Sequence, residues 1–224
     1  MTVKYNFNIV ALPLEILANS CQQVIHGLFT VVNKGYDKPR FKYNVILSPR
    51  IKNADVFFTD LGFEENLQEC VLFLAVLDCE KLMPGFHDIF AKLKIDYDDN
   101  NWFVPKVRKI DQTFNTASIL GTIAFKPYPS TLKSFEITGF TSFERGVGKV
   151  LLSASTNYYQ KELLAEQIVA KVIVEHELIE YYTSIHGFIE VERTLIKKGE
   201  QKSGLEDGII TSGDFHLATL VKNL

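Results

Sequence analysis

Apolar and polar side chains alternate along residues 3–12, which predicts a strand with one buried face. Pro13 suits the first turn of a helix. Residues 14–33 then carry an apolar side chain at every third or fourth position, so they predict an amphipathic helix. Gly35 follows just beyond, where a glycine commonly ends a helix.

The rest of the chain divides into segments of strand or helix length. Residues 70–78 and 167–175 are apolar runs typical of buried central strands. Residues 118–126 and 134–143 are rich in β-forming side chains and read as a hairpin. Further helices are predicted at 54–61, 147–164 and 178–185, and further strands at 188–197 and 215–222. This order predicts a mixed α/β fold, with a mostly antiparallel sheet flanked by helices.

Residues 80–115 lack a long periodic element, although they join two predicted neighbouring strands where a short loop would suffice. Five apolar residues within the segment lie at helical spacing: Met83, Phe86, Ile89, Phe90 and Leu93. A segment of about 36 residues is too short to build an independent core. We therefore expect one domain over residues 1–224, with 80–115 as an inserted lid or partner-binding segment between the second and third strands.

Composition narrows the class of protein. The chain has 224 residues, a formal net charge of −3 and three cysteines at unrelated spacings. The mild negative charge favours neither nucleic acid nor an anionic membrane as a partner. No secretory signal and no membrane-spanning apolar run is visible, and the cysteines suit reduced thiols, so we expect a cytoplasmic protein.

The stretch "ERGVGKVLL", residues 144–152, predicts a glycine turn that begins a helix. It fits neither a P-loop, because Val150 follows Lys149, nor a dinucleotide fingerprint, because Leu151 replaces the third glycine. A plain strand-to-helix turn is the simplest interpretation. The uncovered N–H groups, the helix dipole and the charges of Arg145 and Lys149 nevertheless suit an anion such as a diphosphate.

Further along, "YYTSIHGF" places two tyrosines before a Gly-Phe pair and a strand. Together with "RGVGKVLL", this order resembles the GNAT superfamily of N-acetyltransferases, whose turn is written R/Q-x-x-G-x-G/A and whose second signature is Y-x-x-x-G-F. The chain departs from the family at Phe143, which replaces the Arg or Gln. Tyr182 also stands five residues before Gly187 instead of four, so Tyr181 is a rival for its role.

The resemblance implies acetyl-CoA as co-substrate, with no metal. Residues 96–101, "DYDDNN", lack the glycine and glutamate of a calcium loop. Tyr182 would protonate the leaving thiolate, and a general base would deprotonate the amine; Glu136, Glu175 and His176 are the candidates left open. The residues expected to bind CoA are Phe140, Thr141, Ser142, Arg145, Gly146, Val147, Gly148 and Lys149.

The resemblance favours an acetyl-CoA-dependent N-acetyltransferase that moves an acetyl group to a primary amine of a small molecule or protein. The alternative is a non-catalytic CoA-binding or scaffold protein on the same fold. The acceptor is not specified by any motif, and a homodimer stays open. The resemblance thus implies a GNAT-like fold with a degenerate diphosphate loop, which looks several residues shorter than is usual in the family.

Overall fold

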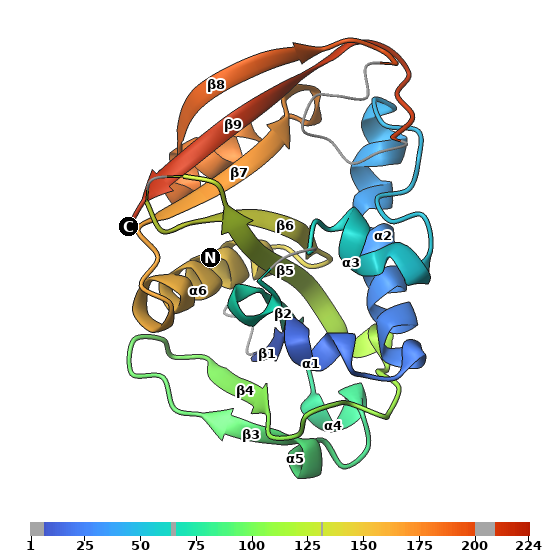
Figure 1. Ribbon diagram of the computed structural model, residues 1–224, viewed down its shortest axis with the longest axis vertical. Helices are drawn as coiled ribbons and strands as arrows, with labels where there is room; N and C mark the ends of the chain where they lie inside the picture. Colours follow the sequence, from blue (N-terminus) through green and yellow to red (C-terminus); the bar gives the residue numbers. More distant parts are fainter. Residues whose placement is uncertain (1–6, 64–65, 131, 200–208) are drawn as a thin grey trace.

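The computed structural model describes residues 7–63, 66–130, 132–199 and 209–224. Within these residues, nine strands form one sheet in the order β3-β4-β1-β2-β5-β6-β7-β9-β8 (Figure 1). The strands are β1 (Asn8–Pro13), β2 (Val71–Val76), β3 (Phe90–Leu93), β4 (Asn101–Pro105), β5 (Ile119–Tyr128), β6 (Ser134–Ser142), β7 (Gln167–Ile173), β8 (Ile189–Ile196) and β9 (Phe215–Asn223). Neighbours pair antiparallel except β1 with β4 and β6 with β7.

The helices are α1 (Leu14–Ala18), α2 (Gln22–Tyr43), α3 (Phe57–Asp60), α4 (Cys79–Leu82), α5 (Phe86–Ile89) and α6 (Val147–Glu162). Short helical turns are η1 (Ala54–Val56), η2 (Leu67–Glu69), η3 (Thr116–Ser118), η4 (Val174–His176) and η5 (Tyr181–Ile185). The predicted mixed, mostly antiparallel α/β fold is confirmed, including an insertion before β5. The first residues of the predicted opening strand, 3–6, lie outside the described residues.

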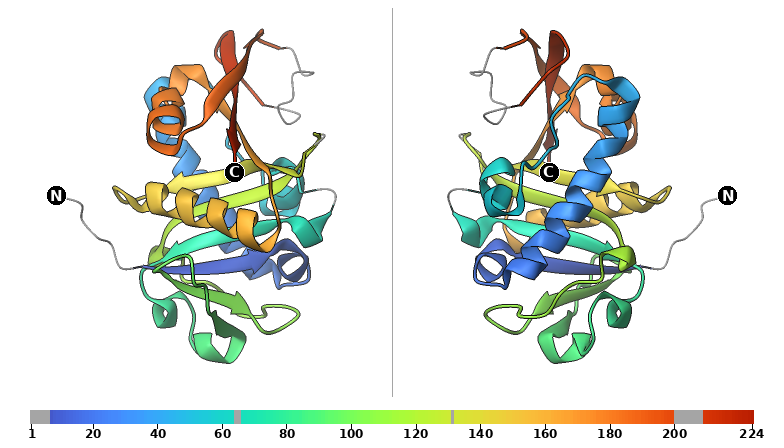
Figure 2. Two further views of the ribbon diagram at one scale, coloured as in Figure 1. Left: turned by 90° about the vertical axis from the view of Figure 1, so that its left-hand side faces the viewer. Right: turned by 90° about the vertical axis from the view of Figure 1, so that its right-hand side faces the viewer.

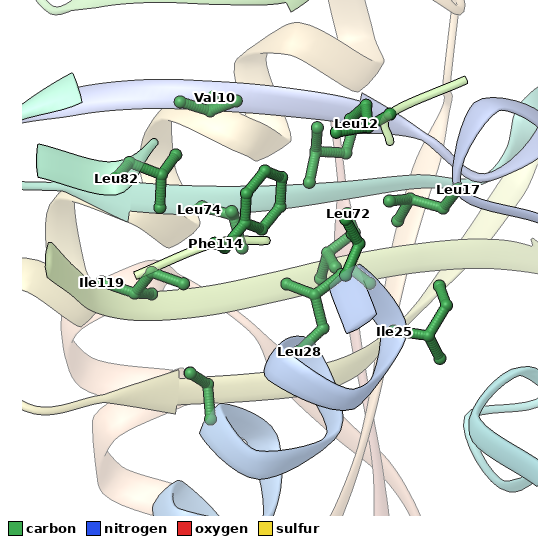
Figure 3. Close-up of a cluster of buried hydrophobic side chains, with 14 of the residues drawn as sticks. Val10, Leu12, Leu17, Ile25, Leu28, Leu72, Leu74, Leu82, Phe114 and Ile119 are labelled. Atoms are coloured by element: carbon green, nitrogen blue, oxygen red, sulfur yellow. The ribbon is translucent and has the colours of Figure 1, made fainter. Parts of the chain in front are cut away.

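Two apolar cores lie on opposite faces of the sheet. Helix α2 crosses one face and α6 crosses the other (Figure 2). All six residues of β2 are buried; Leu72 and Leu74 point into the α2 core, while Phe73 points into the α6 core, because successive strand residues face opposite sides. Figure 3 shows the α2 core, where side chains of β1, β2 and α2 meet.

The predicted helix over 14–33 is wrong in both its continuity and its end. The chain breaks between α1 and α2, where the Cys21 N–H donates to the Ile110 carbonyl and the Ile110 N–H donates to Ser20 Oγ, both at 2.9 Å. The second helix then runs past Gly35 to Tyr43. Gly35 does not end it, because this glycine is a packing contact: a Cβ there would lie 2.3 Å from Thr141 Cγ2.

The inserted segment 80–115 extends the sheet. Its strand β4 pairs in parallel with β1, and β3 pairs with β4. Helical spacing holds for Phe86 in α5 but not for Phe90 and Leu93, which lie in β3. Trp102 of β4 is fully buried, edge-on to Phe73 and stacked on Tyr158 of α6. The segment is therefore part of the core, and its role as a lid stays a prediction.

Candidate functional site

Strands β6 and β7 are neighbours in the sheet but separate along most of their length. They pair only at Ser134–Gln167, Phe135–Ile168 and Glu136–Val169. Beyond Glu136, residues 137–142 of β6 pair with β5 on one side and have no described strand on the other. Figure 1 shows the two strands diverging from this point. Main-chain N–H and C=O groups of β6 thus face the gap between β6 and β7, where they can bond a ligand.

A bulge shapes β6 at the edge of this gap. Ile123 of β5 lies opposite two residues, Gly139 and Phe140, and Gly139 takes a left-handed conformation (φ 56°) that glycine adopts without strain. The Thr122 hydroxyl lies 2.6 Å from the Gly139 carbonyl oxygen, to which it donates, and 2.9 Å from the Thr141 hydroxyl. The bulge sends the side chain of Phe140 to the α6 face and that of Thr141 against α2.

The glycine turn after β6 leads directly into the first turn of α6. Gly146 precedes the helix with φ 91° and has no side chain with which to cap the first N–H groups of α6. Ser142 Oγ accepts the Gly148 N–H at 3.1 Å and donates to the Glu144 carbonyl at 3.0 Å. The turn therefore presents main-chain donors and the positive end of a sixteen-residue helix at the open end of the gap.

The space around this turn suits a phosphate. A Cβ on Gly148 would lie 3.2 Å from Ser142 Cβ and 3.3 Å from the Tyr181 hydroxyl, so only glycine fits comfortably. A Cβ on Gly146 would meet nothing within 4 Å, which leaves room for a ligand. The side chains of Arg145 and Lys149 are exposed beside it.

The two tyrosines of η5 lie across the gap from β6. The ring of Phe140 is 6.4 Å from that of Tyr181 and 6.5 Å from that of Tyr182. Burial raises the pKa of Tyr181 to about 12. Burial, and then the phenols of Tyr36 and Tyr181, raise the pKa of Tyr182 well above its usual range. Both hydroxyls therefore stay protonated at neutral pH and can donate a hydrogen bond.

Glu136 lies apart from these tyrosines, at the end where β6 and β7 still pair. Its carboxylate sits between Lys126 Nζ at 3.6 Å and Lys171 Nζ at 3.4 Å, and all three side chains are largely buried. Two ammonium groups thus engage this carboxylate, away from the glycine turn.

Glu175 and His176 lie just beyond the end of β7, in η4. Glu175 accepts the His216 backbone N–H and lies 2.9 Å from His216 Nδ1. Burial opposes the effect, but these hydrogen bonds from His216 lower the pKa of Glu175. His176 stacks on Tyr43 at 5.3 Å, and burial lowers its pKa, so the ring is neutral at pH 7. Its Nε2 is buried and has no hydrogen-bond partner among the described residues.

Sequence patterns missed several residues near the gap. Tyr36, Lys34 and Lys38 come from the part of α2 beyond residue 33, and the ring of His186 lies 4.9 Å from that of Tyr181, tilted by 60°. Apolar periodicity fades after residue 32, so these α2 residues carried no signal. The run "KGYDKPRFKY" is nevertheless free of strand alternation, and it could have suggested that the helix continues.

The diverging strands, the bulge and the glycine turn at a helix N-terminus define the GNAT fold of N-acetyltransferases. The crystal structure of the NatC complex bound to Gag peptide and CoA includes a chain that superposes with a TM-score of 0.50 and 15% identity, covering 97% of this chain and 99% of that one. An N-acetyltransferase from Staphylococcus aureus Mu50 aligns over 97% of both chains with a TM-score of 0.48 and 10% identity.

The chain belongs to the sporulation protein RMD6 family, whose model matches residues 1–224. The sporulation protein RMD6 of Saccharomyces cerevisiae (strain ATCC 204508 / S288c) is 36% identical over 222 residues, covering 97% of this chain and 95% of the yeast protein.

Two negative findings concern the described residues alone. Their helices are all too short or too polar to cross a membrane. Their His, Cys, Asp and Glu side chains form no group that could hold a metal ion.

Proposed function

We propose that the chain binds acetyl-CoA in the gap between β6 and β7 and transfers the acetyl group to a primary amine of a small molecule or protein. One observation carries this proposal: residues 137–142 of β6 have no described strand partner on the β7 side and lead straight into the glycine turn of α6. The solved NatC structure supports it, because a protein of this fold was crystallised there with CoA and a peptide.

The turn would hold the diphosphate of CoA through the main-chain N–H group of Gly146, with Arg145 and Lys149 adding charge. The Val147 N–H already donates to the Glu144 carbonyl at 3.3 Å. Ser142 orients the turn through its bond to Gly148. Main-chain groups of β6 around Phe140 and Thr141 would bond the pantetheine arm and polarise the thioester carbonyl. The gap thus provides polar groups along its whole length for an extended ligand.

In the transfer step, the amine nitrogen attacks the carbonyl carbon, the carbon–sulfur bond breaks, and the sulfur needs a proton. Tyr182, whose ring lies 6.5 Å from that of Phe140 on β6, is the proposed donor. The proton that the amine loses goes to a base. Glu136, Glu175 and His176 remain the candidates for this role. Glu136 is engaged by two lysines and Glu175 by His216, whereas the His176 ring is neutral and its Nε2 has no hydrogen-bond partner among the described residues.

Phe143 favours the second candidate function, CoA binding without transfer. It stands where the family motif has Arg or Gln, so part of the usual diphosphate contact is absent. The two functions differ in one readout: an enzyme releases free CoA thiol in the presence of an amine, whereas a binding protein does not.

The test is thermal stability with and without CoA. A ligand at about 100 times its dissociation constant adds roughly 2.7 kcal/mol, or about 5–10 °C for a chain of this size. Gly146→Leu should abolish this shift, because the leucine side chain would fill the space beside the turn in which the diphosphate would lie. Gly199→Leu is the matched control, because Gly199 also has a positive φ (83°) and open space around its Cβ position, but lies in the loop after β8.

Both variants should lose some intrinsic stability through backbone strain, on the order of 1–2 kcal/mol. Only Gly146→Leu should lose the response to CoA. An unchanged melting temperature of the wild-type chain in millimolar CoA would reject CoA binding. A normal shift in Gly146→Leu would reject the glycine turn as the diphosphate site.

A further inference from the structure

Two lysines of α2 lie over the ring that replaces the family's Arg or Gln. Lys34 Nζ is 5.4 Å and Lys38 Nζ is 5.2 Å from the centroid of Phe143. The face of an aromatic ring attracts cations, by about 0.5–1 kcal/mol at exposed sites. Two lysine ammonium groups therefore lie over Phe143, the residue at the position where the family motif has Arg or Gln.

The lysines are fixed to the glycine turn by more than this ring. Gly35, between them on α2, packs directly against Thr141, so the helix cannot move away from β6 without losing this contact. Lys38 Nζ also donates to the Ser142 carbonyl at 3.2 Å. Ser142 is the residue whose hydroxyl accepts the Gly148 N–H. This packing contact and this hydrogen bond thus connect α2 to the end of β6 and to the turn.

These positive charges are not neutralised by neighbours. Neither Lys34 nor Lys38 forms an ion pair with a described residue, and Asp37 between them is paired with Arg40 at 2.9 Å. Arg145 and Lys149 likewise form no ion pair within the described residues. Four cations and one carboxylate, that of Glu144, thus lie on or beside one short turn in a chain whose net charge is −3. Such a concentration costs repulsion and favours a multiply charged anion as occupant.

We infer that Lys34 and Lys38 bind the diphosphate of CoA and supply the charge that the family's Arg or Gln would otherwise contribute, with Phe143 as the residue that positions their ammonium groups. This inference rests on the proposed function. It assigns part of the CoA site to α2, the helix that also carries Tyr36 and Tyr43 towards the η4 and η5 side of the gap. Binding of CoA then holds α2 against the turn.

The experiment is calorimetric titration of CoA, dephospho-CoA and pantetheine into the wild-type chain and Lys34→Gln/Lys38→Gln. Each lost charged hydrogen bond weakens binding, so the double variant should bind CoA and dephospho-CoA about 10–100-fold more weakly and pantetheine unchanged. Lys92→Gln/Lys94→Gln is the matched control, since both lysines are exposed at the distant β3 edge. Phe143→Leu should weaken CoA binding about 2–5-fold.

Each outcome has a separate meaning. Equal CoA affinity of the double variant and the wild-type chain would overturn the inference and leave the proposed function standing. A loss seen with CoA but not with dephospho-CoA would overturn the diphosphate assignment, because the lysines would then bind the 3′-phosphate. Absence of CoA binding by the wild-type chain would reject the proposed function itself. The exposed positions make misfolding of the double variant detectable as a lowered melting temperature without ligand.

Discussion

Strands β1 and β6 differ in whether a described strand pairs with them along their whole length. At the β1 edge, the inserted segment supplies β4, which pairs with β1, and Trp102 seals the junction against Phe73 and Tyr158. Between β6 and β7, inside the sheet, residues 137–142 are left without a partner on one side. This difference agrees with the proposal that the gap between β6 and β7 binds a ligand.

The largest expected effect concerns the open gap. If Tyr182 protonates the thiolate, Tyr182→Phe should lower turnover by about 10²–10⁴-fold and leave CoA affinity nearly unchanged. The measurement is steady-state release of free thiol together with calorimetric CoA binding. The same loss in Tyr181→Phe instead would move the role to Tyr181, and no loss in either would make both tyrosines packing residues.

The second largest effect is expected where β4 of the inserted segment pairs with β1. Trp102→Ala removes a fully buried indole and should cost about 3–5 kcal/mol of unfolding free energy. Denaturant unfolding followed by circular dichroism measures this loss. A cost below about 1 kcal/mol would mean that β4 is only loosely attached, and the contrast between the two places would fail.

A smaller effect comes from His186, beside Tyr181. Burial, and then the charges of Lys222 and Lys149, lower the pKa of His186 to about 4. Because this folded value lies below the unfolded one, the stabilisation is complete above about pH 6.5 and is lost as the pH falls towards 4. The loss should amount to about 2–3 kcal/mol.

His186→Phe should remove this part of the pH dependence, measured as the difference from the wild-type chain in unfolding free energy at pH 7 and at pH 4.5. Parallel pH profiles of variant and wild type would show that His186 is well solvated. Glu175, with its lowered pKa, loses stability only at lower pH and is present in both chains.

The smallest expected effect is at the tip of the β3–β4 hairpin. Tyr97 donates to Glu162 of α6 at 3.1 Å, close to solvent. Tyr97→Phe should cost at most about 1 kcal/mol of unfolding free energy, because an exposed hydrogen bond contributes little. A cost as large as that of Trp102→Ala would shift the attachment of the insertion from its buried base to its tip.

The sequence predicted much of this architecture because the signals were local. The apolar run of β2, the hairpin of β5 and β6, and the glycine turn before α6 each depend on neighbouring residues. The end of α2 was predicted too early because Gly35 looked like a helix end. In the structure this glycine lies inside the helix and packs against Thr141, about 100 positions away. Phe90 and Leu93 fit a helical pattern as well as a strand, and only β4 decides between them.

The candidate site was less predictable than the fold. Motif order located Gly146, Gly148 and the two tyrosines. The partners of the base candidates could not be predicted from the sequence, because those of Glu136 and Glu175 come from other strands. Lys34 and Lys38, which we propose as diphosphate ligands, were not predicted for the same reason: the sequence does not show that they lie over Phe143.

Hydrogen exchange with and without CoA tests the central contrast most directly. We expect CoA to slow amide exchange in residues 137–148, along β6 and the glycine turn, and to leave residues 90–105 of the inserted segment unchanged. Exchange that is unaffected in residues 137–148, or slowed equally in both places, would contradict the assignment of the gap between β6 and β7 as the CoA site.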